Sequence, residues 1–302
     1  MRRCALVAFA LLMVRSGLAR AETPRPFVVA ELSDRTHAGL SLTYGRVECE
    51  ACEAPKLETS ALVALAFADL AVRPGLKLWL ALPVVRRHNT AGEFRPESTH
   101  TALGQLTVGL RQMWDVGSTW PVRLSAGASF SGTPRSGAGG EAELTLEAAR
   151  LTSGLPASYF SVATTTTRVH GDVAIARGPV FGQLGLALLL RSPDERELRS
   201  ELAFEALLGV RASARVAVLA ELTAAALDHS LVCQSTCAPE LSGFTSLVAG
   251  NLGVRVALSR VTLGARLVLP LTDDPSPYLG GIGGAARGSV SPALSVEAAA
   301  QF

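Results

Sequence analysis

Leu294-Ser295-Val296-Glu297-Ala298-Ala299-Ala300-Gln301-Phe302 is the stretch that decides the fold. Apolar residues occupy every second position from Leu294 to Phe302, with polar residues at most of the positions between. A period of two describes a β-strand with one apolar and one polar face. Such a strand is suited to face lipid in a membrane barrel. We therefore take Leu294, Val296 and Phe302 as a C-terminal insertion signal, which we expect the barrel-assembly machinery to recognise.

The first 21 residues have the pattern of a secretory signal peptide. A basic start, Met1-Arg2-Arg3, is followed by the apolar run Cys4–Val14 and the small-residue site Ala19-Arg20-Ala21. We predict cleavage after Ala21, because the apolar run is shorter than the ~20 residues that an uncleaved transmembrane anchor needs. The expected parts are a signal peptide over residues 1–21, a periplasmic N-terminal lead-in over residues 22–36 and an outer-membrane β-barrel over residues 37–302.

Apolar residues are spread along the chain and do not form a membrane-spanning run. They make up 48% of the residues and the mean hydropathy is +0.31, yet the longest apolar runs, such as Leu76–Val85, have about ten residues. This distribution indicates either a barrel with an apolar outer belt or the core of a large soluble domain. The aromatic content of 5% is low for a barrel with aromatic girdles, so a soluble periplasmic β-protein is an alternative. The net charge of +2 and the lack of a Lys/Arg cluster argue against nucleic acid as a partner.

Segments with a period of two recur along the chain. In Leu198–Val210, for example, the charged residues share one parity and large apolar residues share the other, whereas a helix would mix the two faces. Short periplasmic turns that alternate with longer outer loops are typical of outer-membrane barrels. The five short joints are Arg73-Pro74-Gly75, Asp115–Thr119, Arg177-Gly178-Pro179, Arg211–Ala214 and Ser259-Arg260. With six longer polar stretches between them, they predict an all-β, transmembrane, antiparallel up-and-down β-barrel of about 12 strands, with both ends in the periplasm.

One segment leaves the number of strands open. Glu141–Leu151 carries several leucines and alanines, and is interpreted either as a short helix in an outer loop or as an extra strand paired with Tyr159–Arg168. The extra strand would give a barrel of 14. We prefer 12, because one strand from about Tyr159 to Arg177 exceeds the ~9–11 residues needed to cross a membrane, whereas Asp172–Arg177 alone is too short.

Three pieces between residues 60 and 135 resemble a known family of barrels. They are the turn and strand Val72–Val85, the glycine-containing strand Leu103–Arg111, and the strand and loop Ala126–Pro134. In this order they resemble the outer-membrane barrels of the MetA pathway of phenol degradation. Leu263–Pro270 resembles the same family more weakly. Gln105 stands where that family usually has Asp. The resemblance implies a transport barrel for an aromatic or apolar solute.

Four cysteines beyond the signal peptide form two close pairs in expected outer loops. An exported chain meets an oxidising environment, so disulfides are favoured over a four-thiolate zinc site. Local pairing, Cys49 with Cys52 and Cys233 with Cys237, is favoured because the two loops should be several strands apart around the rim. We expect no metal and no other cofactor.

Nine charged residues share the polar parity of their strands and are expected to line the lumen. An Arg on the lipid face costs ~2–4 kcal/mol at the membrane midplane, which forces such side chains inward. They form either a charged constriction that selects solutes, or pairs of opposite charge that largely close a lumen of intermediate width. The nine are Arg111, Glu201, Glu205, Arg211, Arg215, Glu221, Arg255, Arg266 and Glu297.

Motifs for catalysis are weak. None of the five histidines lies in a nucleophile motif such as Gly-x-Ser-x-Gly, although His88 and His100 flank one loop beside Ser98. Gly280–Gly284 has no following helix or lysine, so it indicates a flexible outer loop and not a phosphate-binding loop. We therefore predict a monomeric barrel, surrounded by outer-membrane lipid, that is a passive channel or transporter for small solutes. The alternatives are a structural or surface-interaction barrel with a plugged lumen and, less favoured, an outer-membrane hydrolase.

Overall fold

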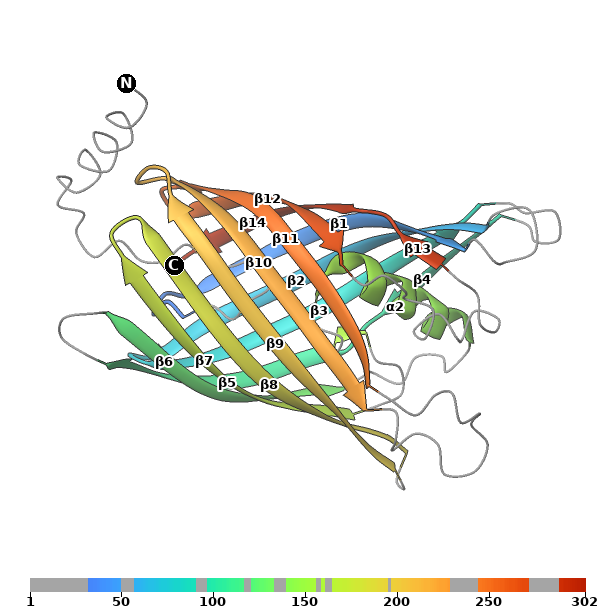
Figure 1. Cartoon of the computed structure of the whole chain (residues 1–302), viewed down its shortest axis with the longest axis horizontal. Coiled ribbons are helices and arrows are strands. Elements are labelled where there is room, and N and C mark those ends of the chain that lie inside the picture. Colours follow the sequence, from blue (N-terminus) through green and yellow to red (C-terminus); the bar gives the residue numbers. More distant parts are fainter. Residues whose placement is uncertain are drawn as a thin grey trace.

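The chain folds into a closed, antiparallel, transmembrane β-barrel, seen here in a computed structural model (Figure 1). The sheet closes because β1 pairs with β2 on one side and with β13 and β14 on the other. The structure describes residues 32–49, 57–90, 97–116, 121–132, 140–155, 159–160, 165–194, 197–228, 244–271 and 288–302.

In the part of the chain that the structure describes, fourteen strands occupy twelve positions around the barrel, so the predicted number of about 12 is confirmed. The first half of β3 pairs with β5 and its second half with β4. In the same way β1 pairs with β14 and then with β13, so each of the pairs β4/β5 and β13/β14 fills a single position. The strands are β1 (His37–Cys49), β2 (Leu57–Arg73), β3 (Leu76–Asn89), β4 (Ser98–Leu103), β5 (Leu106–Val116), β6 (Val122–Gly132), β7 (Thr165–Arg177), β8 (Val180–Asp194), β9 (Glu197–Arg211), β10 (Val216–Asp228), β11 (Phe244–Leu258), β12 (Val261–Pro270), β13 (Gly288–Val290) and β14 (Ala293–Gln301).

The short turns lie at one end of the barrel, where the described part of the chain has both of its termini (Figure 1). Gly75 and Gly178 adopt φ of 76° and 59°, which glycine tolerates without a steric penalty, and Ser259 adopts φ of 46°. These residues form the β2–β3, β7–β8 and β11–β12 turns, as the sequence predicted. Tight turns of this kind keep neighbouring strands antiparallel and in register.

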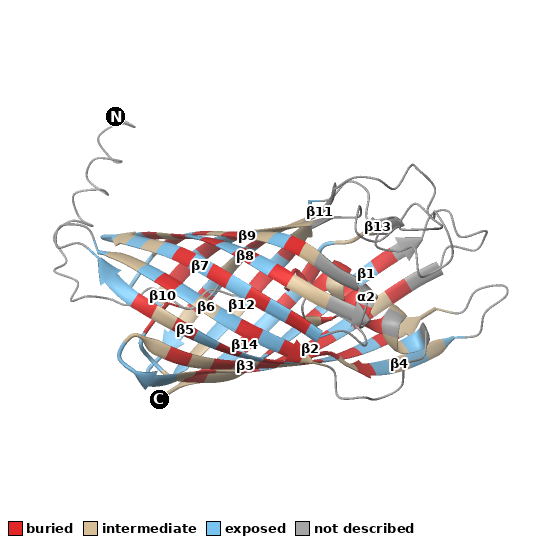
Figure 2. Cartoon of the chain, turned by 90° about the horizontal axis from the view of Figure 1, so that it is seen from below, coloured by how far each residue is buried: buried red, intermediate tan, exposed pale blue. Residues whose placement is uncertain are grey.

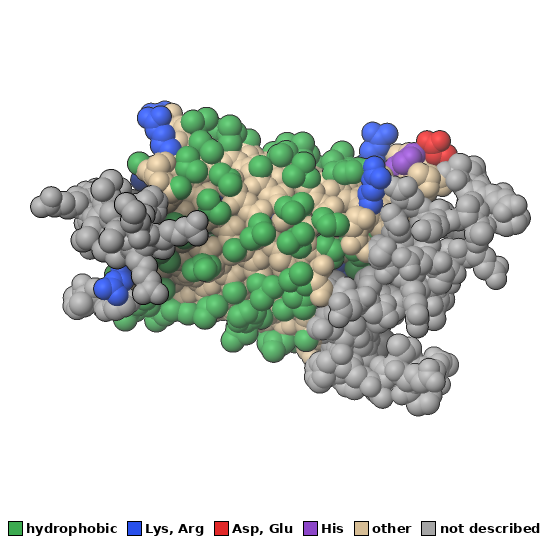
Figure 3. Space-filling view, turned by 45° about the horizontal axis from the view of Figure 1, so that its top comes forward, with side chains coloured by type: hydrophobic (Ala, Val, Ile, Leu, Met, Phe, Trp, Pro, Cys, Tyr) green, Lys and Arg blue, Asp and Glu red, His purple; other side chains and the backbone are tan. Residues whose placement is uncertain are grey.

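On the face seen in Figure 3, apolar side chains occupy the outer surface between the two rims. Buried and exposed residues alternate along the strands, as Figure 2 shows. In β14 the exposed side chains include Leu294 and Val296, at 60% and 48%, whereas Glu297 is 6% exposed. Phe302 follows β14 and is 80% exposed. The residues predicted as the insertion signal therefore lie on the outer side of the barrel.

The segment with two interpretations forms a helix, α2 (Gly140–Ser153), so the extra-strand alternative is wrong. The helix does not extend away from the barrel as an outer loop would. It contacts β1 to β4, β12 and β14, and its Leu146, Ala149 and Leu151 are buried (Figure 1). Neither α2 nor any other helix in the described ranges is long and apolar enough to cross a bilayer.

Residues 32–36 pack against the end of the barrel that carries the short turns. Arg123 of β6 donates to the Leu32 carbonyl oxygen at 2.6 Å and lies 3.1 Å from the Asp34 carboxylate. The Gly75 amide also donates to Asp34, at 3.3 Å. Leu32 and Ser33 are 4% and 5% exposed. The segment is therefore held against the barrel by contacts with β6 and with the turn before β3.

Candidate solute pathway through the barrel

Seven of the nine charged residues expected in the lumen are buried. Their exposed fractions range from 2% to 6%, and they lie on the strand face opposite the apolar outer belt. Parity along each strand brings them to this face, because adjacent side chains of a strand point to opposite sides. The seven are Arg111, Glu201, Glu205, Glu221, Arg255, Arg266 and Glu297.

The other two expected lumen residues lie at the rim that carries the short turns. Arg211, the last residue of β9, is half-buried, and its guanidinium lies 5.5 Å from the centre of the Phe181 ring. Arg215 lies in the β9–β10 turn and is exposed, so its assignment to the lumen is wrong. The alternation that places strand residues does not extend into a turn, where φ and ψ differ from strand values.

Arg255 and Glu297 form an ion pair that reaches across an intervening strand. Two guanidinium nitrogens of Arg255 donate to the two carboxylate oxygens of Glu297, at 2.9 and 3.0 Å. Gly264 of β12 pairs in register with both residues and has no side chain to separate them. The side chains are 1% and 3% exposed, so the pair is shielded from solvent.

Further polar contacts connect the lumen faces of β5 to β9. Arg168 pairs with Glu205, and Arg191 pairs with Glu201. Arg111 contributes a third link, because its Nε donates to His170 Nε2 at 3.2 Å. Opposite charges on nearby strands therefore meet, as expected for a lumen lined by paired ions.

Sequence reasoning missed several buried polar residues of the lumen. Arg168, His170 and Asp172 occupy every second position of β7, so the same parity rule could have found them. Lys77 gave a weaker signal, because it is the one charge within the apolar run Leu76–Val85. It is 1% exposed and pairs in register with Arg111.

Glycines on the lumen face leave room for large side chains of the neighbouring strand. A Cβ at Gly109 would lie 2.2 Å from Trp79 Nε1, and one at Gly209 would lie 2.1 Å from the Phe181 ring. Each glycine pairs in register with the residue that covers it. The large side chains therefore lie along the wall, over a neighbouring backbone, which is a known way to stabilise glycine in strands.

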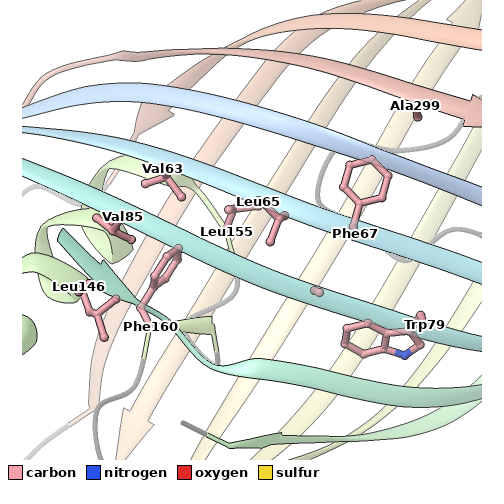
Figure 4. Packing of buried hydrophobic residues seen from close by; sticks show 12 residues of the cluster. Val63, Leu65, Phe67, Trp79, Val85, Leu146, Leu155, Phe160 and Ala299 are labelled. Atoms are coloured by element: carbon pink, nitrogen blue, oxygen red, sulfur yellow. The ribbon is translucent and has the colours of Figure 1, made fainter. Parts of the chain in front are cut away.

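One side of the lumen is apolar and is covered by α2 (Figure 4). β2 and β3 present Val63, Leu65 and Val85 inward, and these pack with Leu146 of the helix and with Phe160. Strands that are apolar on both faces need a cover on each face. Lipid can cover the outer face of β2 and β3, and α2 covers the inner face.

Polar contacts hold α2 at both of its ends. Glu141, in its first turn, pairs with Arg87 of β3 and lies 3.5 Å from His100 Nε2. The Ser153 carbonyl oxygen, at its C-terminus, accepts a hydrogen bond from Arg266 at 3.3 Å. A carboxylate in the first turn and a guanidinium at the last carbonyl both match the helix dipole.

A cavity lies between α2 and the walls formed by β7 to β13, and the empty space there, open solvent included, is about 730 Å³. On the wall side it is bounded by Ala203, Thr223, Ala225 and Ala249, which lie on neighbouring strands in register. These side chains are small and leave space that a Leu or Phe would fill. The helix side contributes Leu151 and Leu155, and the cavity also meets Arg150, Arg168, Leu189, Glu201 and Glu205.

The histidines considered for hydrolase activity contact other groups. His88 Nδ1 lies 3.2 Å from the Thr99 hydroxyl, and His88 Nε2 lies 3.7 Å from Glu97. Ser98 accepts a hydrogen bond from Asn89 at 3.2 Å. His100 faces Glu141, as described above. These contacts do not join a histidine of this loop to a serine nucleophile.

Metal and disulfide sites would need His, Cys, Asp or Glu side chains close together. Within the ranges that the structure describes, no group of three or more His, Cys, Asp and Glu residues is placed to hold a metal ion. Cys49 ends β1, and Cys52, Cys233 and Cys237 lie outside the described residues, so the disulfides stay a prediction.

Comparison with known proteins finds similarity in structure. No protein-family model matches the sequence, and no curated protein sequence does either. The COG4313 outer membrane channel from Pseudomonas putida F1 matches 93% of this chain and 100% of its own, with a TM-score of 0.59 and 9% identity. Both proteins have the same barrel fold. The translocator domain of the autotransporter NalP from Neisseria meningitidis matches 100% of this chain and 96% of its own, with a TM-score of 0.47 and 10% identity.

Proposed function

We propose that this chain is an outer-membrane channel for small solutes, with the cavity beside α2 as the site where a solute binds during passage. The observation that carries the proposal is the row of small inward side chains opposite the helix. A barrel with a purely structural role has no need to leave such a space, and narrow barrels fill their interior with side chains.

The lining favours a solute with an apolar body and a polar group. Leu151, Leu155 and Leu189 offer apolar contacts, whereas Arg168 and Glu205 offer charged hydrogen-bonding groups in the same cavity. Sites for small molecules typically combine apolar walls with a few placed polar groups. The resemblance of the region from residue 60 to 135 to phenol-degradation barrels supports an aromatic solute of this kind.

The outer membrane is the proposed location. An apolar outer belt, paired strands without a free edge and an interior with buried charges are the properties of bacterial outer-membrane barrels. Short turns belong on the periplasmic side and longer loops outside in such barrels, which would place α2 toward the outside. Unboiled protein from the outer-membrane fraction is expected to migrate differently from boiled protein. Soluble protein without this shift would contradict the proposed location.

A second candidate is a structural barrel with a plugged lumen. The observation that favours it is the burial of paired charges, such as Arg255 and Glu297. Ion pairs that meet across the interior block the lumen, unless the paired side chains move apart when a solute passes. Solute passage distinguishes the two candidates, because a plugged barrel would allow none.

The test is permeation of small aromatic acids and alcohols into liposomes that contain the purified barrel. Ala225→Leu is designed to fill the cavity, and is expected to slow permeation several-fold. Ala265→Leu is the matched control, because Ala265 lies in β12 on the exposed outer face and the chemical change is the same. Permeation equal to that of protein-free liposomes would overturn the channel. Equal permeation by the wild type and Ala225→Leu would overturn the role of the cavity.

A further inference from the structure

Two arginines lie on the outer, lipid-facing side of the barrel, at the end that carries α2. Arg46 of β1 and Arg86 of β3 are exposed. They alternate with inward residues of the same strands, because Val47, Val85 and Arg87 are buried. Figure 3 shows basic side chains at this end, next to a histidine and an acidic residue and beyond the apolar belt.

Strand register brings these arginines to one patch. Arg46 pairs with Ser60 of β2, which pairs with His88 of β3, and Arg86 lies two residues before His88. Strand spacings of ~4.8 Å across and ~3.4 Å along place the two arginine Cα atoms about 12 Å apart. Two long side chains at this separation can contact one large headgroup. We call Arg46, Arg86 and His88 the basic rim patch.

The surface next to the patch is suited to acyl chains. Leu62 pairs in register with Arg86, and Val84 lies two residues from Arg86 toward the apolar belt; they are 41% and 38% exposed on the outer face. Tyr44 is 44% exposed, and its hydroxyl oxygen accepts a hydrogen bond from Arg46 Nε at 3.2 Å. Tyrosines with a polar tip prefer the depth of lipid headgroups. The arginines therefore lie at the level where phosphate groups are expected.

A carboxylate near the patch restricts what it can bind. His88 Nε2 lies 3.7 Å from the carboxylate of Glu97, which precedes β4. A carboxylate beside the patch favours a ligand whose negative charge lies close to the arginines on the membrane side. A lipid phosphate meets this condition better than a soluble polyanion, which would also approach this carboxylate.

We propose that the basic rim patch binds the phosphate groups of a phosphorylated glycolipid in the membrane leaflet on the α2 side. The guanidinium groups of Arg46 and Arg86 contact the phosphates, and the acyl chains lie against Leu62 and Val84. Basic residues near a membrane surface attract anionic headgroups in this way. The inference uses the location in the outer membrane and is independent of solute passage, so it stands if the lumen is plugged.

The experiment measures binding of bisphosphorylated lipid A to the full-length, detergent-purified barrel, with its dephosphorylated form as the comparison probe. Each arginine near the surface is expected to contribute about 5-fold in affinity, so R46A/R86A should weaken binding about 25-fold. The control R177A/R260A removes two arginines that are exposed at the opposite end, and should bind like the wild type. A heat-dependent gel shift in every variant establishes that the barrels are folded.

Three results would overturn the proposal. R46A/R86A could bind like the control, or the dephosphorylated lipid could bind as tightly as the phosphorylated one. The third is loss of wild-type binding in EDTA, which would assign the binding to a bridging divalent cation and not to the guanidinium groups. Binding that persists in EDTA, requires phosphate and is lost in R46A/R86A supports the proposal.

Discussion

Replacing Glu297 by Ala is expected to destabilise the barrel by about 3–5 kcal/mol, because it leaves the Arg255 guanidinium buried without its carboxylate. The magnitude follows from the burial of the pair. Its side chains are 1% and 3% exposed and share hydrogen bonds of 2.9 and 3.0 Å. An ion pair in open water would contribute only ~0.2–1 kcal/mol.

The assay is urea unfolding of the barrel in phospholipid vesicles, followed by tryptophan fluorescence, with reversibility checked by refolding. The matched control is R255M/E297L, which removes both charges and keeps apolar side chains at both positions. Replacing a buried pair in this way is often neutral or stabilising by ~1–4 kcal/mol. The urea concentration at the midpoint of unfolding should therefore be equal to or higher than that of the wild type for the control. It should be well above the midpoint of Glu297→Ala.

If Glu297→Ala lowers the free energy of unfolding by less than about 1 kcal/mol, the reasoning is refuted, because a solvated ion pair contributes about that much. Water would then reach the lumen at the level of Gly264, over which the two side chains meet. A small loss in Glu297→Ala has two explanations, a solvated ion pair or a general tolerance of β14 to substitution. The double variant distinguishes them, because a solvated pair predicts no gain in stability when both residues are replaced by apolar ones.

Three further predictions concern packing, the N-terminal segment and the cysteines. Gly109→Ala should destabilise by about 1–3 kcal/mol in urea unfolding, because the added Cβ would lie 2.2 Å from Trp79 Nε1. Gly132→Ala meets only a ring carbon at 3.6 Å and should stay within about 0.5 kcal/mol, and equal losses would contradict the packing argument. Arg123→Ala removes the contacts to residues 32–36, so proteinase K should cut before β1 faster than in the wild type; an unchanged rate would show that these contacts do not hold the segment. Non-reducing peptide mapping should find the pairs Cys49–Cys52 and Cys233–Cys237, and peptides that join the two loops would contradict local pairing.

The strands could be predicted from sequence because lipid imposes a simple rule on them. A residue on the outer face must be apolar, so period two is visible in most segments and fixes the face of each charge. The same rule predicted burial of Glu205 and Arg255, and it failed at Arg215 because that residue lies in a turn. The partners of the charges depend on register between strands that are far apart in the sequence, which no local pattern contains.

The position of α2 was the main feature that the sequence analysis did not predict. Its own residues permit a helix, but its place inside the barrel depends on β2 and β3, whose inner faces are apolar. The signal was present in the sequence as strands with apolar residues on both parities, such as Ala61–Ala68 and Leu76–Val85. A strand of this kind requires a partner on each face, and only the assembled barrel identifies α2 as that partner.

Electrical recording from the purified barrel in a planar lipid bilayer tests the proposed channel most directly. The channel account predicts discrete conductance steps in the wild type and in Ala265→Leu, smaller steps in Ala225→Leu, and partial block by small aromatic acids. Protein that is inserted and shows the heat-dependent gel shift, yet gives no steps and passes no solute, would contradict the account and establish a plugged barrel.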